Sequence, residues 1–129
     1  MDLPDELKAM LDGPNFATLV TLMPDGSPQA STMWVDRQAD RIRFNTAEGR
    51  TKPRNMDRDP RVAVSIFARE DPYQAFSIRG RVVEKRLEGA DDHIDALAGK
   101  YLGVDEYPYR VPGQVRIIYL VEADRVAAH

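Results

Sequence analysis

The sequence lacks several residue types and patterns that whole classes of function require. It contains no cysteine, which excludes disulfides, thiolate nucleophiles and thiolate metal sites. Its two histidines, His93 and His129, stand far apart in the chain, so we expect no histidine-based metal site. No apolar run approaches the length of a membrane span and the first ten residues do not resemble a signal peptide, so we expect a cytoplasmic protein with no membrane partner. The net charge of −3 argues against a general nucleic-acid binder.

The composition is that of an ordinary globular chain. The 129 residues are 43% apolar and 30% charged, which separates the protein from disordered sequences. A chain of this length buries roughly two-thirds of its unfolded surface. We therefore expect one domain over residues 1–129, with no linker or internal repeat.

The most informative stretch runs over residues 41–68. Residues 42–45 alternate apolar and polar side chains, which is typical of a half-buried strand. Thr51 can then cap a short helix, with Pro53 tolerated in the first turn because the N–H groups there have no intrahelical partner. The helix ends before Pro60, and the β-branched run over residues 62–67 predicts a second strand.

Basic residues are concentrated in this stretch although the whole chain is acidic. The basic positions are Arg50, Lys52, Arg54, Arg58 and Arg61. A helix N-terminus flanked by cations and preceded by Asn45 and Thr46 offers dipole, charge and hydrogen-bond donors to a phosphate. The segment therefore predicts an anion site, and a solvated charged helix without a ligand is the alternative.

The rest of the chain predicts mainly strands. A long strand over residues 74–87 contains Gly80, which indicates a bulge or a bend. The other expected elements are a helix over 4–11 with Asp2 as its candidate cap, a hairpin of strands 16–23 and 28–36 continuing as a meander into 41–45, a loop over 69–72, a helix over 88–102, a loop over 105–113, and a strand over 114–121 with a tail to 126. Together they predict a mostly β fold: a small antiparallel barrel with short helices at its ends, whose closure would protect the strand edges.

Four motifs then resemble a known family. The segments TLMPDGSPQASTMWVD, RIRFNTAEGRTKPRNMDRDPRVAVSI, FSIRGRVVE and AGKYLG are similar to the split β-barrel flavin/deazaflavin oxidoreductases, the pyridoxamine-phosphate-oxidase-like proteins. Within that superfamily the chain looks most like the branch that uses coenzyme F420. The resemblance covers about residues 15–126, and NTAEGRTKPRNMDRDPR is its most specific part.

The resemblance implies a cofactor site at the interface of a homodimer. The deazaflavin ring would lie along Gln29, Ser31, Trp34 and Val35, with a packed core position as the alternative for Trp34. The phosphate end would contact Asn45, Thr46, Arg50 and Lys52, with Pro53, Arg54 and Asn55 adjacent. The partner subunit would close the groove through the loop over residues 72–76, which includes Tyr73 and Gln74, unless the aromatic residues of that loop only pack.

The resemblance also implies an activity. We expect a reductase that transfers a hydride from reduced coenzyme F420 to an electrophilic double bond, such as an enone or a tetrapyrrole methine. No residue stands out as a general acid, which fits a reaction whose chemistry belongs to the cofactor. The alternatives are an FMN-dependent oxidase or reductase, a non-catalytic deazaflavin carrier, a haem-binding or haem-degrading protein, and a barrel that serves only as an interaction module.

Overall fold

Strands make up most of the molecule, and three short helices are inserted between them. A computed structural model describes residues 1–129. In chain order the elements are α1 (Asp5–Asp12), β1 (Ala17–Leu22), β2 (Pro28–Met33), β3 (Asp36–Gln38), β4 (Arg41–Ala47), α2 (Thr51–Arg58), β5 (Arg61–Ala68), β6 (Asp71–Arg86), α3 (Ala90–Leu102) and β7 (Arg116–Ala128). None of the helices is long and apolar enough to cross a membrane.

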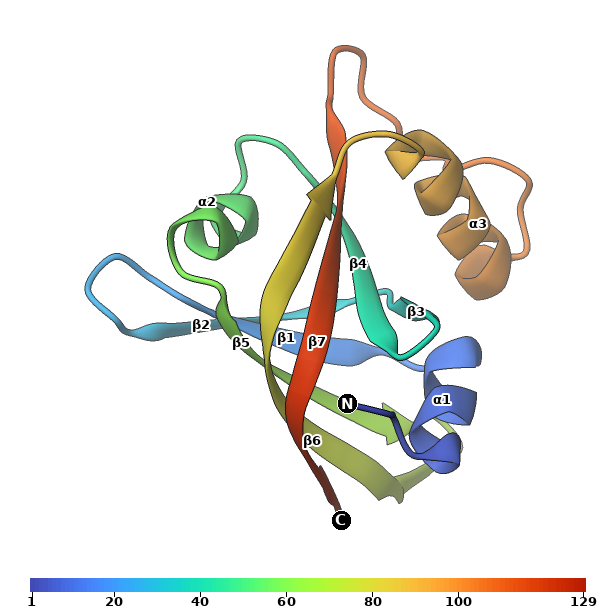
Figure 1. Ribbon diagram of the computed structural model, residues 1–129. Helices are drawn as coiled ribbons and strands as arrows, with labels where there is room; N and C mark the ends of the chain where they lie inside the picture. The colour runs from blue at the N-terminus through green and yellow to red at the C-terminus, as the bar shows by residue number, and fades with distance from the viewer.

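The seven strands form one antiparallel sheet in the order β2-β1-β5-β6-β7-β4-β3. The sheet coils strongly, and α2 and α3 flank its β4 region on either side (Figure 1). This is a split β-barrel, which confirms the predicted fold class. The expectation of closure is wrong, because β2 and β3 both remain at free edges. Those edges are kept short: β3 has three residues, and β2 begins with Pro28, which has no N–H to offer.

A single main core fills the concave side of the sheet. It comprises 19 buried residues, contributed by α1, α2 and the strands and, outside these elements, by Leu3 and Val35. Leu7 and Leu11 of α1 are fully buried, and they meet Phe44 of β4 and Tyr119 of β7 in the same cluster. The alternation predicted over residues 42–45 holds for Ile42, Arg43 and Phe44, whereas Asn45 is buried as well.

The hairpin strand expected over residues 28–36 is in fact two elements. The first, β2, ends at Met33, and only the last expected residue, Asp36, belongs to the second, β3 (Asp36–Gln38), which pairs with β4 instead of β1, so the expected meander is wrong. The break falls at Val35, whose N–H donates to Tyr101 Oη at 3.0 Å and whose carbonyl accepts from Lys100 Nζ. Because α3 satisfies this backbone, the chain can leave one strand pair and join another.

The irregularity predicted at Gly80 is confirmed. The register between β6 and β7 shifts between Arg79 and Gly80. A Cβ at this position would lie 2.3 Å from the carbonyl oxygen of Glu122, so only glycine allows the two strands to approach this closely.

Several predicted boundaries and caps are wrong. Asp2 does not cap α1, because that helix begins only after Pro4. Thr51 is the first residue of α2 instead of its cap; Arg50 occupies the cap position, and no side chain bonds the free amides. The loop expected over residues 69–72 is shorter, because β6 already begins at Asp71.

Candidate functional site

A pocket of about 310 Å³ opens where the start of α2, the face of α3 and the end of β2 meet. We call it the cationic pocket. Its lining consists of Phe16, Thr32, Met33, Trp34, Asn45, Arg50, Lys52, Ile94, Leu97, Tyr107, Tyr109 and Arg116. No aspartate or glutamate is among these residues.

Three cations face this pocket without forming an ion pair. Arg50, Lys52 and Arg116 take part in no ion pair. Arg116 is only 6% exposed, and its guanidinium donates to the neutral amide oxygens of Asn45, at 2.9 Å, and Gln114, at 3.2 Å. A buried charge without a close opposite charge is unfavourable, so an anion in this pocket would offset the cost of burying these cations.

Burial also perturbs these cations. It lowers the pKa of Lys52 below 10.5, and the neighbouring charge of Arg50 lowers the same pKa further. Burial likewise lowers the pKa of Arg116, although a guanidinium stays protonated in proteins. An anionic ligand would relieve both effects.

Helix α2 is fixed by its inner face and its C-terminal half. Asn55 is buried and donates to Thr21 Oγ1 at 3.0 Å, which ties the helix to β1. Asp57 accepts hydrogen bonds from Tyr119 Oη at 2.8 Å and Lys85 Nζ at 2.9 Å. Burial, followed by the bond to Asp57, raises the pKa of Tyr119, so its hydroxyl stays a donor. The opposite end of the helix is left uncapped, and its first N–H groups have no intrahelical partner.

An aromatic wall forms the other side of the cationic pocket. Trp34 stacks on Tyr101 with ring centroids 5.2 Å apart and planes 5° apart. Tyr107 meets Trp34 edge-on at 6.0 Å, and the Arg116 guanidinium lies 5.3 Å from the centre of the Tyr107 ring. Burial raises the pKa of Tyr101 to about 12, and its hydroxyl donates to the carbonyl of Asn15 at 2.6 Å. Tyr101, which is itself fixed by this hydrogen bond, therefore holds Trp34 in place.

The structure brings four of the predicted cofactor residues together in the lining: Trp34, Asn45, Arg50 and Lys52. Ser31 and Thr46 lie outside the lining, yet their hydroxyl oxygens are the two buried side-chain polar atoms without a hydrogen-bond partner. Gln29 lies on β2, on the same face as Ser31, and its amide oxygen accepts a long bond of 3.4 Å from the Thr21 hydroxyl.

The other predicted contacts lie elsewhere. The Val35 side chain belongs to the core. Pro53 and Asn55 are buried on the inner face of α2, and Arg54 is exposed outside the lining. Tyr73 and Gln74 lie in β6 instead of a loop; Tyr73 is 88% exposed, and neither residue lines this pocket.

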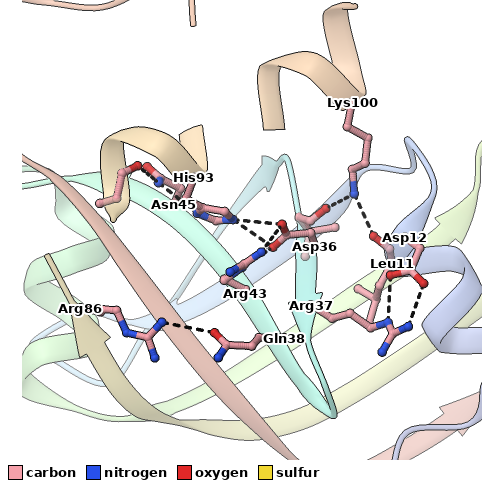
Figure 2. Close-up of polar contacts among 12 residues, drawn as sticks. Leu11, Asp12, Asp36, Arg37, Gln38, Arg43, Asn45, Arg86, His93 and Lys100 are labelled. Carbon is pink, nitrogen blue, oxygen red and sulfur yellow. Dashed lines mark hydrogen bonds and ion pairs between the residues drawn. The ribbon is translucent and has the colours of Figure 1, made fainter. Parts of the chain in front are cut away.

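Sequence reasoning missed a buried polar network behind the cationic pocket. His93 of α3 lies between Asn45 and Asp36, and Asp36 in turn accepts two hydrogen bonds from Arg43, each of 2.9 Å (Figure 2). Asp36 and Arg43 flank a short turn, and this pairing across a hairpin was a signal in the sequence. Arg116 was also missed, although a charged residue opening the apolar run of β7 is unusual.

The fold and this pocket together define a split-barrel protein with a cationic, aromatic-walled pocket. A profile of the pyridoxamine 5'-phosphate oxidase family matches residues 3–126, and the chain belongs to this family.

Solved structures support the same fold. An F420 reductase superposes with a TM-score of 0.83 at 27% identity, covering 97% of this chain and 98% of that one. General Stress Protein 26 from Bacillus anthracis gives a TM-score of 0.71 at 15% identity, covering 99% and 94%. A haem-binding protein from Mycobacterium smegmatis gives 0.65 at 20% identity, covering 100% of this chain and 55% of that protein. At such identities the last two show similarity of fold alone.

Proposed function

We propose that this protein is an oxidoreductase that binds coenzyme F420 and reduces an electrophilic double bond in a small acceptor, such as an enone or a tetrapyrrole. The observation that carries the proposal is the cationic pocket: Arg50, Lys52 and Arg116 face one aromatic-walled cavity with no acidic residue in its lining. A ligand that fits must carry negative charge and a flat ring. The 27% identity with an F420 reductase over nearly the full length supports the deazaflavin in particular.

The residues present fit a phosphate-bearing deazaflavin. Arg50, Lys52 and the free amides at the start of α2 would hold the phosphate, because a guanidinium can donate two parallel hydrogen bonds to it. Trp34 and Met33 at the end of β2 would contact the ring. When bound in its reduced form, the deazaflavin supplies the hydride.

The chain's own contribution would be binding and orientation. The lining contains no carboxylate, imidazole or thiol, so none of these groups is placed to transfer a proton. Holding two reactants in contact and in alignment lowers a barrier by several kcal/mol, typically about 7–11 kcal/mol when the geometry is ideal. The apolar side chains of Ile94 and Leu97 would exclude water from the reacting atoms.

We also propose that a second copy of the chain completes the site. Tyr73 and Gln74 lie at the exposed start of β6, outside their own pocket, which leaves them available to a partner subunit.

The positions of the two histidines do not support a haem site in the cationic pocket. Both ring nitrogens of His93 are engaged by Asn45 and Asp36, and His129 bonds to Ser77. Neither histidine lines the cationic pocket, so neither is placed to ligate an iron there.

The test is a titration of the purified apo-protein with coenzyme F420, followed by deazaflavin fluorescence, in parallel with FMN. We expect tight binding of coenzyme F420 and weak binding of FMN. The double variant Arg50→Ala/Lys52→Ala should lose at least about 100-fold in affinity, since hydrogen bonds to charged groups contribute about 1.5–3 kcal/mol each. Arg61→Ala is the matched control, because Arg61 is basic, close in sequence and bonded to Asp59 instead of facing the pocket.

Each alternative has its own outcome. Preference for FMN would replace the deazaflavin with a flavin in the same pocket. Tight binding without turnover of any enone or tetrapyrrole by the reduced cofactor would indicate a carrier. Full affinity in the double variant would place the phosphate elsewhere. Binding of neither cofactor would leave an interaction module with the same fold.

A further inference from the structure

The orientation of the Asn45 side-chain amide is determined by two partners that each have a single role. Its oxygen accepts from Arg116 Nε at 2.9 Å, and a guanidinium can only donate. Its nitrogen donates to the carbonyl of Ala90 at 2.8 Å, and a carbonyl can only accept. Neither bond tolerates a flipped amide, so the amide nitrogen must also be the atom that faces His93.

This orientation fixes the protonation of His93. The Nδ1 atom lies 3.1 Å from the amide nitrogen of Asn45, so it has to accept and carries no proton. The proton therefore sits on Nε2, which lies 3.0 Å from Asp36 Oδ1 and donates to it. His93 is 5% exposed, so water does not compete for either nitrogen. The result is a chain of bonds from Asp36 through His93 and Asn45 to Arg116 in the cationic pocket, of which Figure 2 shows the part from Asp36 to Asn45.

We propose that neutral His93 is a positioning residue for the cationic pocket: it holds the side chain of Asn45, and Asn45 in turn holds Arg116. Protonation of His93 in acid then releases both side chains and weakens anion binding. The identity of the anion rests on the proposed function. The arrangement of the side chains of His93, Asn45 and Arg116 does not depend on that function.

Protonation would place a second donor against Asn45. With a proton on Nδ1, two N–H groups would face each other across 3.1 Å, so the contact between His93 and Asn45 has to break. Asn45 would then turn or withdraw, and the Nε bond that holds Arg116 would be lost with it.

The surrounding charges act in both directions. They are Asp36 on β3, Arg43 on β4, Asp91 and Lys100 on α3, and Arg116 on β7. Asp36 and Asp91 favour a cationic His93, whereas Arg43, Lys100 and Arg116 oppose it. Although burial raises the pKa of Asp36, bonds from His93 and Arg43 hold it below 3.8 on balance. Asp36 therefore stays ionised over the range in which histidines titrate, about pH 8 to 5.

Two substitutions separate positioning from packing. In His93→Gln the amide oxygen can accept from Asn45 and the amide nitrogen can donate to Asp36, while the side chain does not titrate. His93→Leu keeps the apolar volume and removes both bonds. The measured quantity is the affinity for coenzyme F420 between pH 8 and pH 5.5, expressed relative to His93→Gln, so that the titration of any other group in the protein or the ligand cancels.

We expect wild-type affinity to fall about tenfold more than that of His93→Gln as the pH is lowered, one decade corresponding to one lost hydrogen bond to a charged group. His93→Leu should bind weakly at both pH values. At pH 8 the glutamine variant should match the wild type. Parallel pH profiles for wild type and His93→Gln would overturn the proposal, even if the leucine variant does not fold.

A second measurement needs no ligand. The ¹⁵N chemical shifts of the His93 ring should show the proton on Nε2 at pH 8, with His93→Gln supplying the assignment. The side-chain Nε–H resonance of Arg116 should move with His93 protonation in the wild type and stay still in His93→Gln. A proton on Nδ1 at pH 8, or an Arg116 resonance independent of His93, would refute the proposal. If neither coenzyme F420 nor FMN binds, the proposed function fails. The chemical shifts of His93 and Arg116 still test the proposed positioning role of His93.

Discussion

The two ends of α2 carry similar basic residues and use them differently. Arg50, Lys52 and Arg54 at the first turn make no hydrogen bond or ion pair through their side chains. At the other end Arg58 donates to the Leu22 carbonyl and to Asn55, and Arg61 pairs with Asp59. A count of basic residues in the sequence treats all five alike. Only their partners separate the cations that hold the fold from those that bond to no other residue.

The first test of this comparison removes the hydrogen bonds that anchor the C-terminal half of α2. Asn55 is 2% exposed and connects Thr21 to Arg58. Asn55→Ala should lower the free energy of unfolding by about 1–3 kcal/mol, because it leaves buried polar groups without partners. Chemical denaturation measures the change, with Arg54→Ala from the exposed face as control. If Asn55 serves only as an anchor, the folded fraction should bind coenzyme F420 with unchanged affinity. Reduced affinity would indicate that Asn55 contacts the cofactor, as the resemblance implies.

A smaller effect should appear in the pH dependence of cofactor affinity, through Lys52 at the start of α2. Because burial lowers the pKa of Lys52 below 10.5, its charge is present at neutral pH and is lost as the pH rises through the lowered value. The affinity for coenzyme F420 should therefore begin to fall at a pH where ordinary lysines are still protonated. Lys52→Arg should hold its affinity over the same range, since arginine does not deprotonate there. Identical alkaline profiles for the two proteins would show that Lys52 does not contact the anion.

The smallest effect is expected at Arg54. This residue is exposed and lies outside the lining of the cationic pocket. Arg54→Ala should lower cofactor affinity by no more than about threefold at low salt, and the difference should shrink as added salt shortens the Debye length from about 10 Å at 0.1 M. A loss as large as that of Arg50→Ala would mean that the bound cofactor reaches Arg54.

The sequence was sufficient for most of the fold because its strands are strongly patterned. The run over residues 62–67 and the turn at residues 24–27 indicate their structures locally, and β5 and the β1–β2 hairpin lie where expected. The bulge at Gly80 was predictable for the same reason. The split between β2 and β3 was not, because it depends on Tyr101 and Lys100 bonding a backbone segment more than sixty residues away in the chain.

The candidate site was predictable only in part. Arg50 and Lys52 were found because they cluster in sequence beside a helix start. Arg116 and His93 were not, because each acquires its role from a neighbour across the sheet or from an adjoining helix. Pattern along the chain reports local structure, whereas the pairing of a buried charge is a tertiary property.

The register between β4 and β7 also determines when the site can exist. Ala47 pairs with Arg116, and the Asn45–Arg116 bond joins residues 71 positions apart. A contact between residues so distant in sequence requires the long loop between them to close, which carries an entropic cost. During synthesis the pocket therefore remains incomplete until β7 has left the ribosome, and a nascent chain that already has its hairpin and α2 still lacks Arg116 in the pocket lining.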